Sequence, residues 1–326
     1  MSNAFLNVKD LVVEYTSGGQ VIHAVNGVSF SLEKGKTLGL VGETGAGKTT
    51  IAKSILGILP DPPAKIRQGS IEFDGQDLVT AKEEEMLKIR GNRIAMIFQD
   101  PMTALNPLMT VGDQIREVVE IHHGGNKSNA SKERAIEMLK MVGITPERYD
   151  EFPFQFSGGM KQRVVIAMAL ACDPQLLLAD EPTTALDVTI QAQVLDMMNE
   201  LRKKFNTSMI LITHDLGVVA EMCDDVAVVY AGEIIEKGTK FDLFDYPTHP
   251  YTKGLFASLP SMADDAEKRL HPIPGMMPDP TDLPRGCKFS PRCPYATEAC
   301  RAGEIPLTEI APGHFCRCCH PDGKEE

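Results

Sequence analysis

Residues 42–49 read GETGAGKT and match the pattern G-x-x-x-x-G-K-[ST] without a gap. The apolar run Lys36–Val41 precedes this octet, and the segment Thr50–Leu59, which has helical spacing, follows it. A glycine-rich loop between a strand and a helix aims successive backbone N–H groups at one point, where the helix N-terminus adds positive potential. The octet therefore predicts a loop that cradles a polyphosphate.

The side chains of the octet extend this prediction. Lys48 is predicted to reach the β- and γ-phosphates of a nucleotide, and the Thr49 hydroxyl to ligate Mg²⁺. The glycines allow the tight turn that brings the backbone close to the phosphates. The predicted nucleotide-binding residues of this segment are Gly42, Glu43, Thr44, Gly45, Ala46, Gly47, Lys48, Thr49 and Thr50.

Length, composition and charge narrow the class of protein. With 326 residues, 43% hydrophobic and 24% charged, the chain has the composition of a soluble globular protein with room for one large core and an appendage. It contains no apolar run of 18 residues and no secretory signal, so we expect a cytosolic location. The net charge of −12 argues against a general nucleic-acid binder.

The order of the predicted elements indicates an α/β fold. Strands and helices alternate around the octet and again after residue 175, which predicts a mostly parallel sheet with helices on both faces. Leu6–Tyr15 and Val21–Leu32 alternate polar and apolar residues around a glycine turn, as two antiparallel strands do. Helical periods predict a helical subdomain over about residues 101–165. From about Pro247 the chain is proline-rich and is predicted to be irregular.

Two further motifs carry chemistry. The apolar strand Gln175–Asp180 ends in Asp180 and Glu181, which we interpret as an Mg²⁺ ligand acting through water and as the general base. The sequence FSGGMKQR, residues 156–163, opens an apolar helix with Ser157 as its N-cap. Its free backbone donors form a second anion site with no local ligand, which predicts a nucleotide shared between two subunits.

The order GETGAGKT, Gln99, FSGGM, LLLADE, Ala185–Leu186–Asp187 and His214 resembles an ABC transporter ATPase subunit over about residues 4–245. The resemblance implies that Tyr15 stacks on adenine and that Gln99 joins the Mg²⁺ shell and senses the membrane partner. It also implies that Ser157, Gly158 and Gly159 bind the γ-phosphate held by the opposite subunit. Asp187 would lie in the turn that links the two sites, and His214 would touch the γ-phosphate and orient water. Because no motif residue departs from the working pattern, we expect hydrolysis.

Two stretches, FQDPMTALNP and PTHPYTKGLFASLP, resemble the ATPase subunits of dipeptide and oligopeptide importers, and nickel importers are close relatives. The signature region is similar to the D-type subunit. The resemblance implies two separate membrane permease subunits, an extracellular peptide-binding protein and a peripheral position at the cytoplasmic face of the membrane. It favours a companion ATPase subunit, with a homodimer as the alternative. A soluble ABC ATPase unconnected with transport and an Fe–S redox protein that only binds nucleotide are the competing hypotheses.

Six of the eight cysteines lie in the last forty residues, which in a cytosolic chain favours metal or Fe–S ligation over disulfides. Single thiols at Cys172 and Cys223 are predicted to be buried and inert. The tail is similar to peptide-importer ATPases with a [4Fe–4S] cluster, and this resemblance implies Cys287, Cys293, Cys300 and Cys318 as ligands. Zinc and free thiols remain alternatives, as do Cys316, Cys319 and His320 for the fourth ligand. We expect an ABC nucleotide-binding domain at 1–245 and a C-terminal extension at 246–326 that a structural cluster would hold together.

Overall fold

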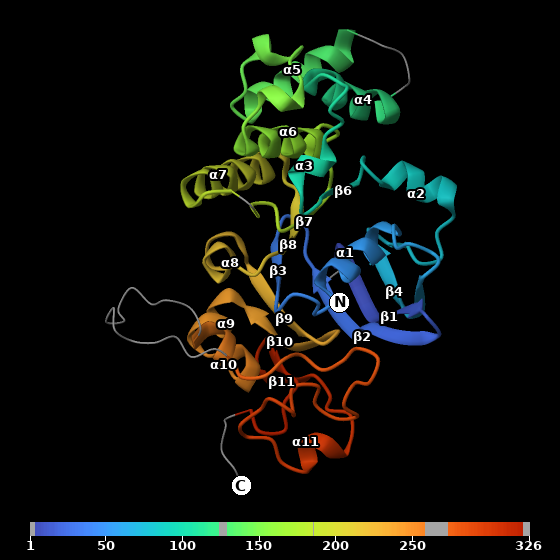
Figure 1. Ribbon diagram of the computed structural model, residues 1–326, viewed down its shortest axis with the longest axis vertical. Helices are drawn as coiled ribbons and strands as arrows, with labels where there is room; N and C mark the ends of the chain where they lie inside the picture. The colour runs from blue at the N-terminus through green and yellow to red at the C-terminus, as the bar shows by residue number, and fades with distance from the viewer. Residues whose placement is uncertain (1–3, 124–128, 185, 258–272, 322–326) are drawn as a thin grey trace. The chain divides into compact units, whose positions relative to one another are not determined.

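The computed structural model describes residues 4–123, 129–184, 186–257 and 273–321 (Figure 1). The chain divides into two compact units. The first unit comprises Met1–Ser31, Leu38–Val79 and Thr213–Glu326, and the second comprises Leu32–Thr37 and Thr80–Ile212. No helix of the described ranges combines the length and the apolar character that crossing a bilayer requires.

The N-terminal part of the first unit is an antiparallel sheet with strand order β2-β1-β4-β5 (Figure 1). Strands β1 (Leu6–Ser17) and β2 (Gln20–Leu32) are joined by Gly18 and Gly19, whose φ angles are 58° and 81°. Positive φ at both loop positions matches the twist of a two-residue hairpin. Strand β4 (Ala64–Phe73) pairs with β1, and β5 (Gln76–Asp77) pairs with β4. The predicted glycine turn is thus confirmed.

The rest of the first unit contains the phosphate loop. Strand β3 (Thr37–Val41), which leads into the loop, is parallel to β9 (Asp225–Tyr230). The order continues antiparallel through β10 (Glu233–Thr239), β12 (His314–Cys316) and β11 (Thr308–Ala311). The side chains of β3 are all buried, as expected of a strand covered on both faces. The helices are α1 (Lys48–Leu56), α8 (Leu216–Met222), α9 (Lys240–Asp245), α10 (Pro250–Ala257) and α11 (Ala299–Ala302).

The second unit has its own parallel strands, in the order β6-β7-β8. They are β6 (Ile94–Ile97), β7 (Leu176–Asp180) and β8 (Ser208–Ile212), and both β7 and β8 are fully buried. Helices α4, α5 and α6 pack on one another at the predicted helical subdomain (Figure 1). The helices are α2 (Glu83–Ile89), α3 (Pro101–Ala104), α4 (Val111–His123), α5 (Asn129–Met141), α6 (Gly158–Leu170) and α7 (Val188–Phe205), with 3-10 turns at Pro146–Arg148 and Pro153–Gln155.

The structure differs from the predicted elements in three places. Helix α1 ends at Leu56 because Gly57 takes the left-handed conformation at its C-cap, so the prediction of a helix to Leu59 was too long. The sequence predicts a proline- and glycine-marked connection over Leu59–Gly69 and a short strand at Ser70–Phe73. Strand β4 instead begins at Ala64, because it pairs with β1 as far as Tyr15. The predicted irregular tail contains α10, β11 and β12, and β12 pairs with the edge of β10. The sequence did not reveal this pairing because the strands are short and lie far apart in the chain.

Candidate functional site

The backbone of the phosphate loop requires glycine at two positions. Gly42 has a φ of 147°, and a Cβ there would lie 2.1 Å from the Val229 carbonyl oxygen on β9. Gly47 has a φ of 104°, and a Cβ there would lie 2.4 Å from the Ala24 carbonyl oxygen on β2. Because both contacts are with backbone atoms, no side chain could be accommodated without moving a strand. The loop is therefore set tightly between β9 and β2.

Lys48 is the first residue of α1, and its side chain is buried inside the loop. It is 6% exposed, and its Nζ donates to the carbonyl oxygens of Gly42 at 2.7 Å and Glu43 at 2.9 Å. The N-cap of the helix, Gly47, makes no side-chain cap bond. Because glycine has no side chain that could cap the helix, Gly47 suits an anion-binding helix N-terminus.

The other predicted nucleotide-binding residues of the first unit lie close to this point. The Tyr15 hydroxyl on β1 is 3.4 Å from the Oγ1 of Thr50, which lies in the first turn of α1. Thr44 and Gly45 are exposed, Glu43 and Thr49 are half-buried, and Ala46 is buried. The structure thus brings Tyr15 to the helix that the octet opens, while its stacking on adenine stays a prediction.

Two residues of the extension, Tyr251 and Arg292, contact Glu43, although neither was predicted to belong to the site. The Arg292 guanidinium donates to the two carboxylate oxygens of Glu43 at 2.9 and 3.1 Å. The Tyr251 hydroxyl accepts a hydrogen bond from the Glu43 N–H at 3.0 Å. Burial, the largest single effect, lowers the pKa of Arg292, but the hydrogen bonds and charge interactions with Glu43 and Tyr230 together outweigh it and raise the pKa above its ordinary value. The PTHPY stretch contained a signal for Tyr251, whereas no local pattern pointed to Arg292.

The acidic motif of the second unit forms at the end of β7. Asp180 is 3% exposed, and Glu181 follows it with a φ of 47°. Left-handed backbone is uncommon for glutamate, and such strained positions concentrate at functional sites. The Glu181 Oε2 accepts hydrogen bonds from the Gln99 Nε2 at 3.0 Å and the Thr184 Oγ1 at 2.9 Å. The structure therefore joins the predicted base to Gln99 and adds Thr184, which the sequence analysis missed.

The signature segment opens α6, as predicted. The Ser157 Oγ accepts a hydrogen bond from the Met160 N–H at 3.4 Å, and Ser157 and Gly158 are exposed. A Cβ on Gly159 would lie 2.4 Å from the Ile190 Cγ2 on α7. The N-cap of α7 is Asp187, whose Oδ1 accepts from the Ile190 N–H at 3.0 Å. The signature and the Asp187 turn thus form one packed corner, although Ala185 of that turn lies outside the described residues.

His214 lies on an exposed turn between β8 and α8. The residue after His214, Asp215, is the N-cap of α8. Its side chain accepts hydrogen bonds from the N–H groups of Gly217 and Val218 at 2.9 and 3.3 Å. The Asp215 N–H donates to the Thr213 Oγ1 at 3.0 Å. His214 is therefore an exposed residue in a turn that the hydrogen bonds of Thr213 and Asp215 hold in place.

Five tail cysteines line one small cavity of about 10 Å³: Cys287, Cys293, Cys300, Cys318 and Cys319. Burial raises the pKa of the Cys287 thiol to about 12 and that of the Cys318 thiol to about 11. Cys316 is absent from this lining and lies on β12, where it is 1% exposed. The four thiols predicted to act together thus surround one space. Within the described ranges, however, no three His, Cys, Asp or Glu side chains have the mutual arrangement of a metal site.

His249 lines the same cavity. It is 1% exposed, and its Nδ1 accepts a hydrogen bond from the Tyr251 N–H at 3.0 Å. Burial lowers the pKa of His249 to about 3, so the imidazole is neutral and its Nε2 carries the proton. This N–H has no hydrogen-bond partner among the described residues. Because buried donors are normally hydrogen-bonded, a water molecule or another small group is the expected partner of this N–H.

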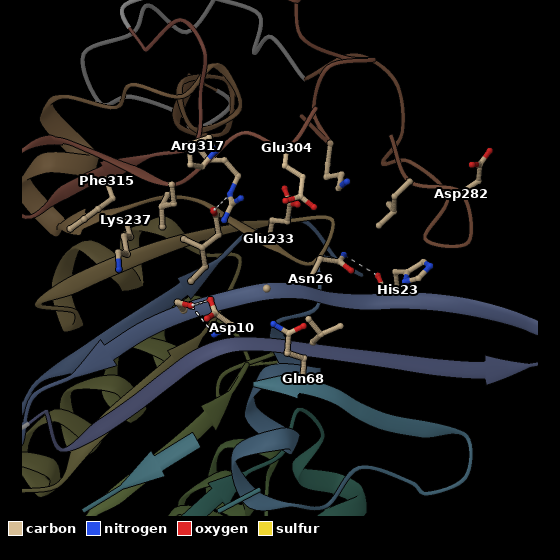
Figure 2. A pocket seen from close by; sticks show the side chains of 18 of the residues that line it. Asp10, His23, Asn26, Gln68, Glu233, Lys237, Asp282, Glu304, Phe315 and Arg317 are labelled. Carbon is tan, nitrogen blue, oxygen red and sulfur yellow. Dashed lines mark hydrogen bonds between the residues drawn. The ribbon is translucent and has the colours of Figure 1, made fainter. Parts of the chain in front are cut away.

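The first unit also contains a much larger cavity, of about 1000 Å³ (Figure 2). None of the predicted nucleotide or metal residues lines it. Its charges are of both signs, with Glu233, Glu304 and Arg317 grouped on one wall (Figure 2). The Arg317 side chain is already engaged with the carbonyl oxygens of Ile234 and Ile305 at 3.1 and 2.8 Å. A triphosphate needs an excess of positive charge and free donors, so this cavity is not the nucleotide site.

Two parts of the chain match known protein families. Residues 25–184 match the ABC transporter family, and residues 235–300 match the C-terminal region of oligopeptide and dipeptide transporters. The oligopeptide transport ATP-binding protein OppD of Bacillus subtilis is 51% identical over 97% of this chain and 89% of its own length. The dipeptide transport ATP-binding protein DppD of Escherichia coli is 48% identical over 98% of this chain and 97% of its own length.

Solved structures agree with this result. The ATP-binding cassette MJ0796, in a dimeric post-hydrolysis state bound to ADP and Pi, is 27% identical over 72% of this chain and 98% of its own, with a TM-score of 0.65. The α/β fold with a phosphate loop is therefore that of an ATP-binding cassette. Because relatives of about half identity cover nearly the whole sequence, the chain belongs to the ABC transporter ATPases, in the group of the oligopeptide and dipeptide transport ATP-binding proteins.

Proposed function

We propose that this chain is the ATPase subunit that drives uptake of dipeptides or longer peptides through separate permease subunits. The observation that carries the proposal is the likeness to OppD and DppD, which extends through the C-terminal extension as well as the cassette. A cassette alone would support ATP hydrolysis coupled to transport but not the choice of solute. The extension, which matches the oligopeptide and dipeptide transporter region, favours peptides over nickel.

The proposed chemistry assigns a role to each residue of the motifs. The loop Gly42–Thr49 binds the phosphates of ATP, with Lys48 at the β- and γ-phosphates and Tyr15 against the adenine. Thr49, Gln99 and Asp180 would hold Mg²⁺, which when bound neutralises charge on the β- and γ-phosphates. Glu181 accepts the proton of the attacking water, and its bonds to Gln99 and Thr184 hold the carboxylate in place. His214 orients that water and contacts the γ-phosphate.

We propose that two ATPase subunits share each nucleotide. Ser157 and Gly158 are exposed at the N-terminus of α6, and Ser157, Gly158 and Gly159 would bind the γ-phosphate held by the partner. Asp187, packed in the same corner, would report occupancy of one site to the other. The dimeric state of MJ0796 bound to ADP and Pi supports this assembly. A companion ATPase is the preferred second subunit of this dimer. Gln99 and the helical subdomain would contact two permease subunits at the cytoplasmic face of the membrane. An extracellular peptide-binding protein would deliver the peptide to the permease.

The solute can be tested by reconstitution. The ATPase is incorporated into liposomes with its permease subunits, its companion ATPase and the binding protein, and phosphate release is measured with Mg-ATP. Dipeptides or oligopeptides are expected to stimulate hydrolysis several-fold, because the loaded binding protein favours the closed nucleotide-bound state. Nickel ions serve as the comparison. Stimulation by nickel and not by peptides would assign the chain to metal uptake, and hydrolysis unaffected by the permease would contradict a transport role.

We also propose that the tail binds a [4Fe–4S] cluster through Cys287, Cys293, Cys300 and Cys318. Four thiols that line one space fit the donor set of such a cluster. The space itself has room for about one water molecule, so the four thiols would have to move apart to hold a cluster there. The group, when bound, would supply a covalent staple between loops that have little core of their own.

Anaerobic purification tests the cluster. The protein is expected to be brown, with visible thiolate-to-iron absorption and about four iron atoms per chain in elemental analysis. Cys318→Ser should lose both, whereas Cys316→Ser should retain them because Cys316 does not line the cavity. Cys172→Ser, which changes a single buried thiol in the other unit, is the matched control. A colourless protein with stoichiometric zinc, or with neither metal, would contradict the cluster.

A further inference from the structure

Glu43 is bound at every one of its polar groups, although it occupies a position that the octet pattern leaves unspecified. Its N–H donates to the Tyr251 hydroxyl at 3.0 Å, and its carbonyl oxygen accepts from the Lys48 Nζ at 2.9 Å. Its carboxylate is held by the two terminal nitrogens of Arg292 at 2.9 and 3.1 Å. The second residue of the phosphate loop is thus fixed from outside by the extension.

A single peptide group, between Gly42 and Glu43, links the hydrogen bond of Tyr251 to that of Lys48. The Glu43 N–H and the Gly42 carbonyl belong to the same planar trans peptide, so they point in opposite directions. When Tyr251 holds the N–H, the Gly42 carbonyl is turned the other way, where it accepts from the Lys48 Nζ at 2.7 Å. The tyrosine therefore sets the orientation of a carbonyl that positions the lysine ammonium.

Arg292 is also held in place by contacts other than the one with Glu43. Its side chain is 6% exposed, and it donates to the Pro274 and Ile273 carbonyl oxygens at 2.9 and 3.3 Å. The guanidinium also lies 3.3 Å from the Tyr230 hydroxyl. A planar fork bound on several sides offers two parallel N–H groups in a fixed direction, which a lysine cannot reproduce. The carboxylate of Glu43 is thereby fixed in position as well as neutralised.

A buried aromatic cluster supports both residues. The Tyr251 ring is fully buried, with its centroid 4.6 Å from that of Tyr230 and 5.4 Å from that of Phe289. The Phe289 carbonyl oxygen accepts from the Arg292 N–H at 2.9 Å, so the backbone before Arg292 is tied to the same cluster. Burial also raises the pKa of Tyr251, which keeps the phenol neutral. Rigid support of this kind is typical of residues that hold a site in its working geometry.

We propose that Tyr251 and Arg292 are positioning residues of the ATP site, which preset the phosphate loop and Lys48 by holding Glu43. The proposal rests on ATP binding at this loop and gives the extension a part in nucleotide affinity. With the loop preset, binding free energy is not spent on ordering Glu43 and Lys48 when the nucleotide arrives. Without the two residues, the nucleotide itself has to order them, so binding weakens more than turnover.

Tyr251→Phe is the sharpest variant, because it keeps the buried ring and removes only the hydroxyl. We expect the KM for Mg-ATP and the Kd for a fluorescent ATP analogue to rise about tenfold, with kcat at saturating ATP reduced less than about twofold. Tyr246→Phe, which removes the hydroxyl of a 73% exposed tyrosine nearby in the chain, is the control and should change neither constant. A loss confined to the active fraction, with KM unchanged, would show that Tyr251 supports only the fold.

The ion pair is tested by a double-mutant cycle of Arg292→Lys and Glu43→Gln, with melting temperatures recorded for each variant. Because both residues act through one contact, the double variant should bind the ATP analogue about as weakly as the worse single variant. Arg285→Ala, an exposed arginine of the same segment, is the control. Fully additive losses, or unchanged affinity in folded Arg292→Lys and Tyr251→Phe proteins, would overturn the proposal. The variant Lys48→Ala tests ATP binding at this loop separately. A failure of the ATP-site proposal can therefore be distinguished from a failure of the positioning proposal.

Discussion

Replacing Glu181 by glutamine is expected to lower kcat for steady-state ATP hydrolysis by about a thousandfold, while ATP still binds. Glutamine keeps the size of the side chain and can still accept the hydrogen bonds from Gln99 and Thr184, but it cannot take a proton from water. Phosphate release at saturating Mg-ATP measures the loss. Size-exclusion chromatography with ATP should show dimers that persist, since the nucleotide that closes them is no longer consumed.

The control for this prediction is Glu200→Gln, which changes an exposed carboxylate on α7 in the same unit. It should retain wild-type turnover and show only transient dimers. If Glu181→Gln instead hydrolysed ATP at the normal rate, Glu181 would have no place in the mechanism. If it bound ATP without ever associating with a second ATPase subunit, the shared-nucleotide proposal would fail while the catalytic assignment stood.

Lys48→Ala is expected to weaken ATP binding by about 3 kcal/mol, or more than a hundredfold in Kd, because it removes two or more charge-assisted hydrogen bonds to phosphate. The Lys48 ammonium is held by the carbonyl groups of Gly42 and Glu43, and alanine would remove this fixed positive charge from the loop. Titration with the fluorescent ATP analogue measures the change.

Lys65→Ala, which removes an exposed lysine on β4, controls for the loss of one positive charge. It should bind ATP normally. A thermal melt of Lys48→Ala without nucleotide separates binding from folding, since both variants should remain cooperative. Normal ATP affinity in a folded Lys48→Ala protein would remove the phosphate loop from the site.

The predictable part of this site was the part encoded in short continuous motifs. The loop at 42–49, the acidic end of β7 and the Ser157 cap of α6 each depend on neighbours in sequence, so their local structure followed from residue type and spacing. Pairing between β10 and β12 depends on residues about eighty positions apart, and no local periodicity reports it. The same holds for Arg292, which meets Glu43 across 249 positions of the chain.

Glu181 illustrates a second limit of sequence reasoning. Its place after an apolar strand predicted a carboxylate at a strand end, but its left-handed backbone could not be read from the sequence, because glutamate rarely adopts it. The bond with Thr184 was missed for a different reason. Thr184 lies in a run of small and polar residues that would suit any turn, and only the fold shows that its hydroxyl meets the carboxylate.

The buried stacking of Tyr230, Tyr251 and Phe289 has a practical consequence for anyone who shortens this protein. Cutting after Asp245 would remove two of the three rings, expose the remaining Tyr230 and leave Glu43 in the phosphate loop without its partner Arg292. If Tyr251 and Arg292 preset the ATP site as proposed, the smallest functional fragment of this ATPase is longer than the cassette that its fold alone would suggest.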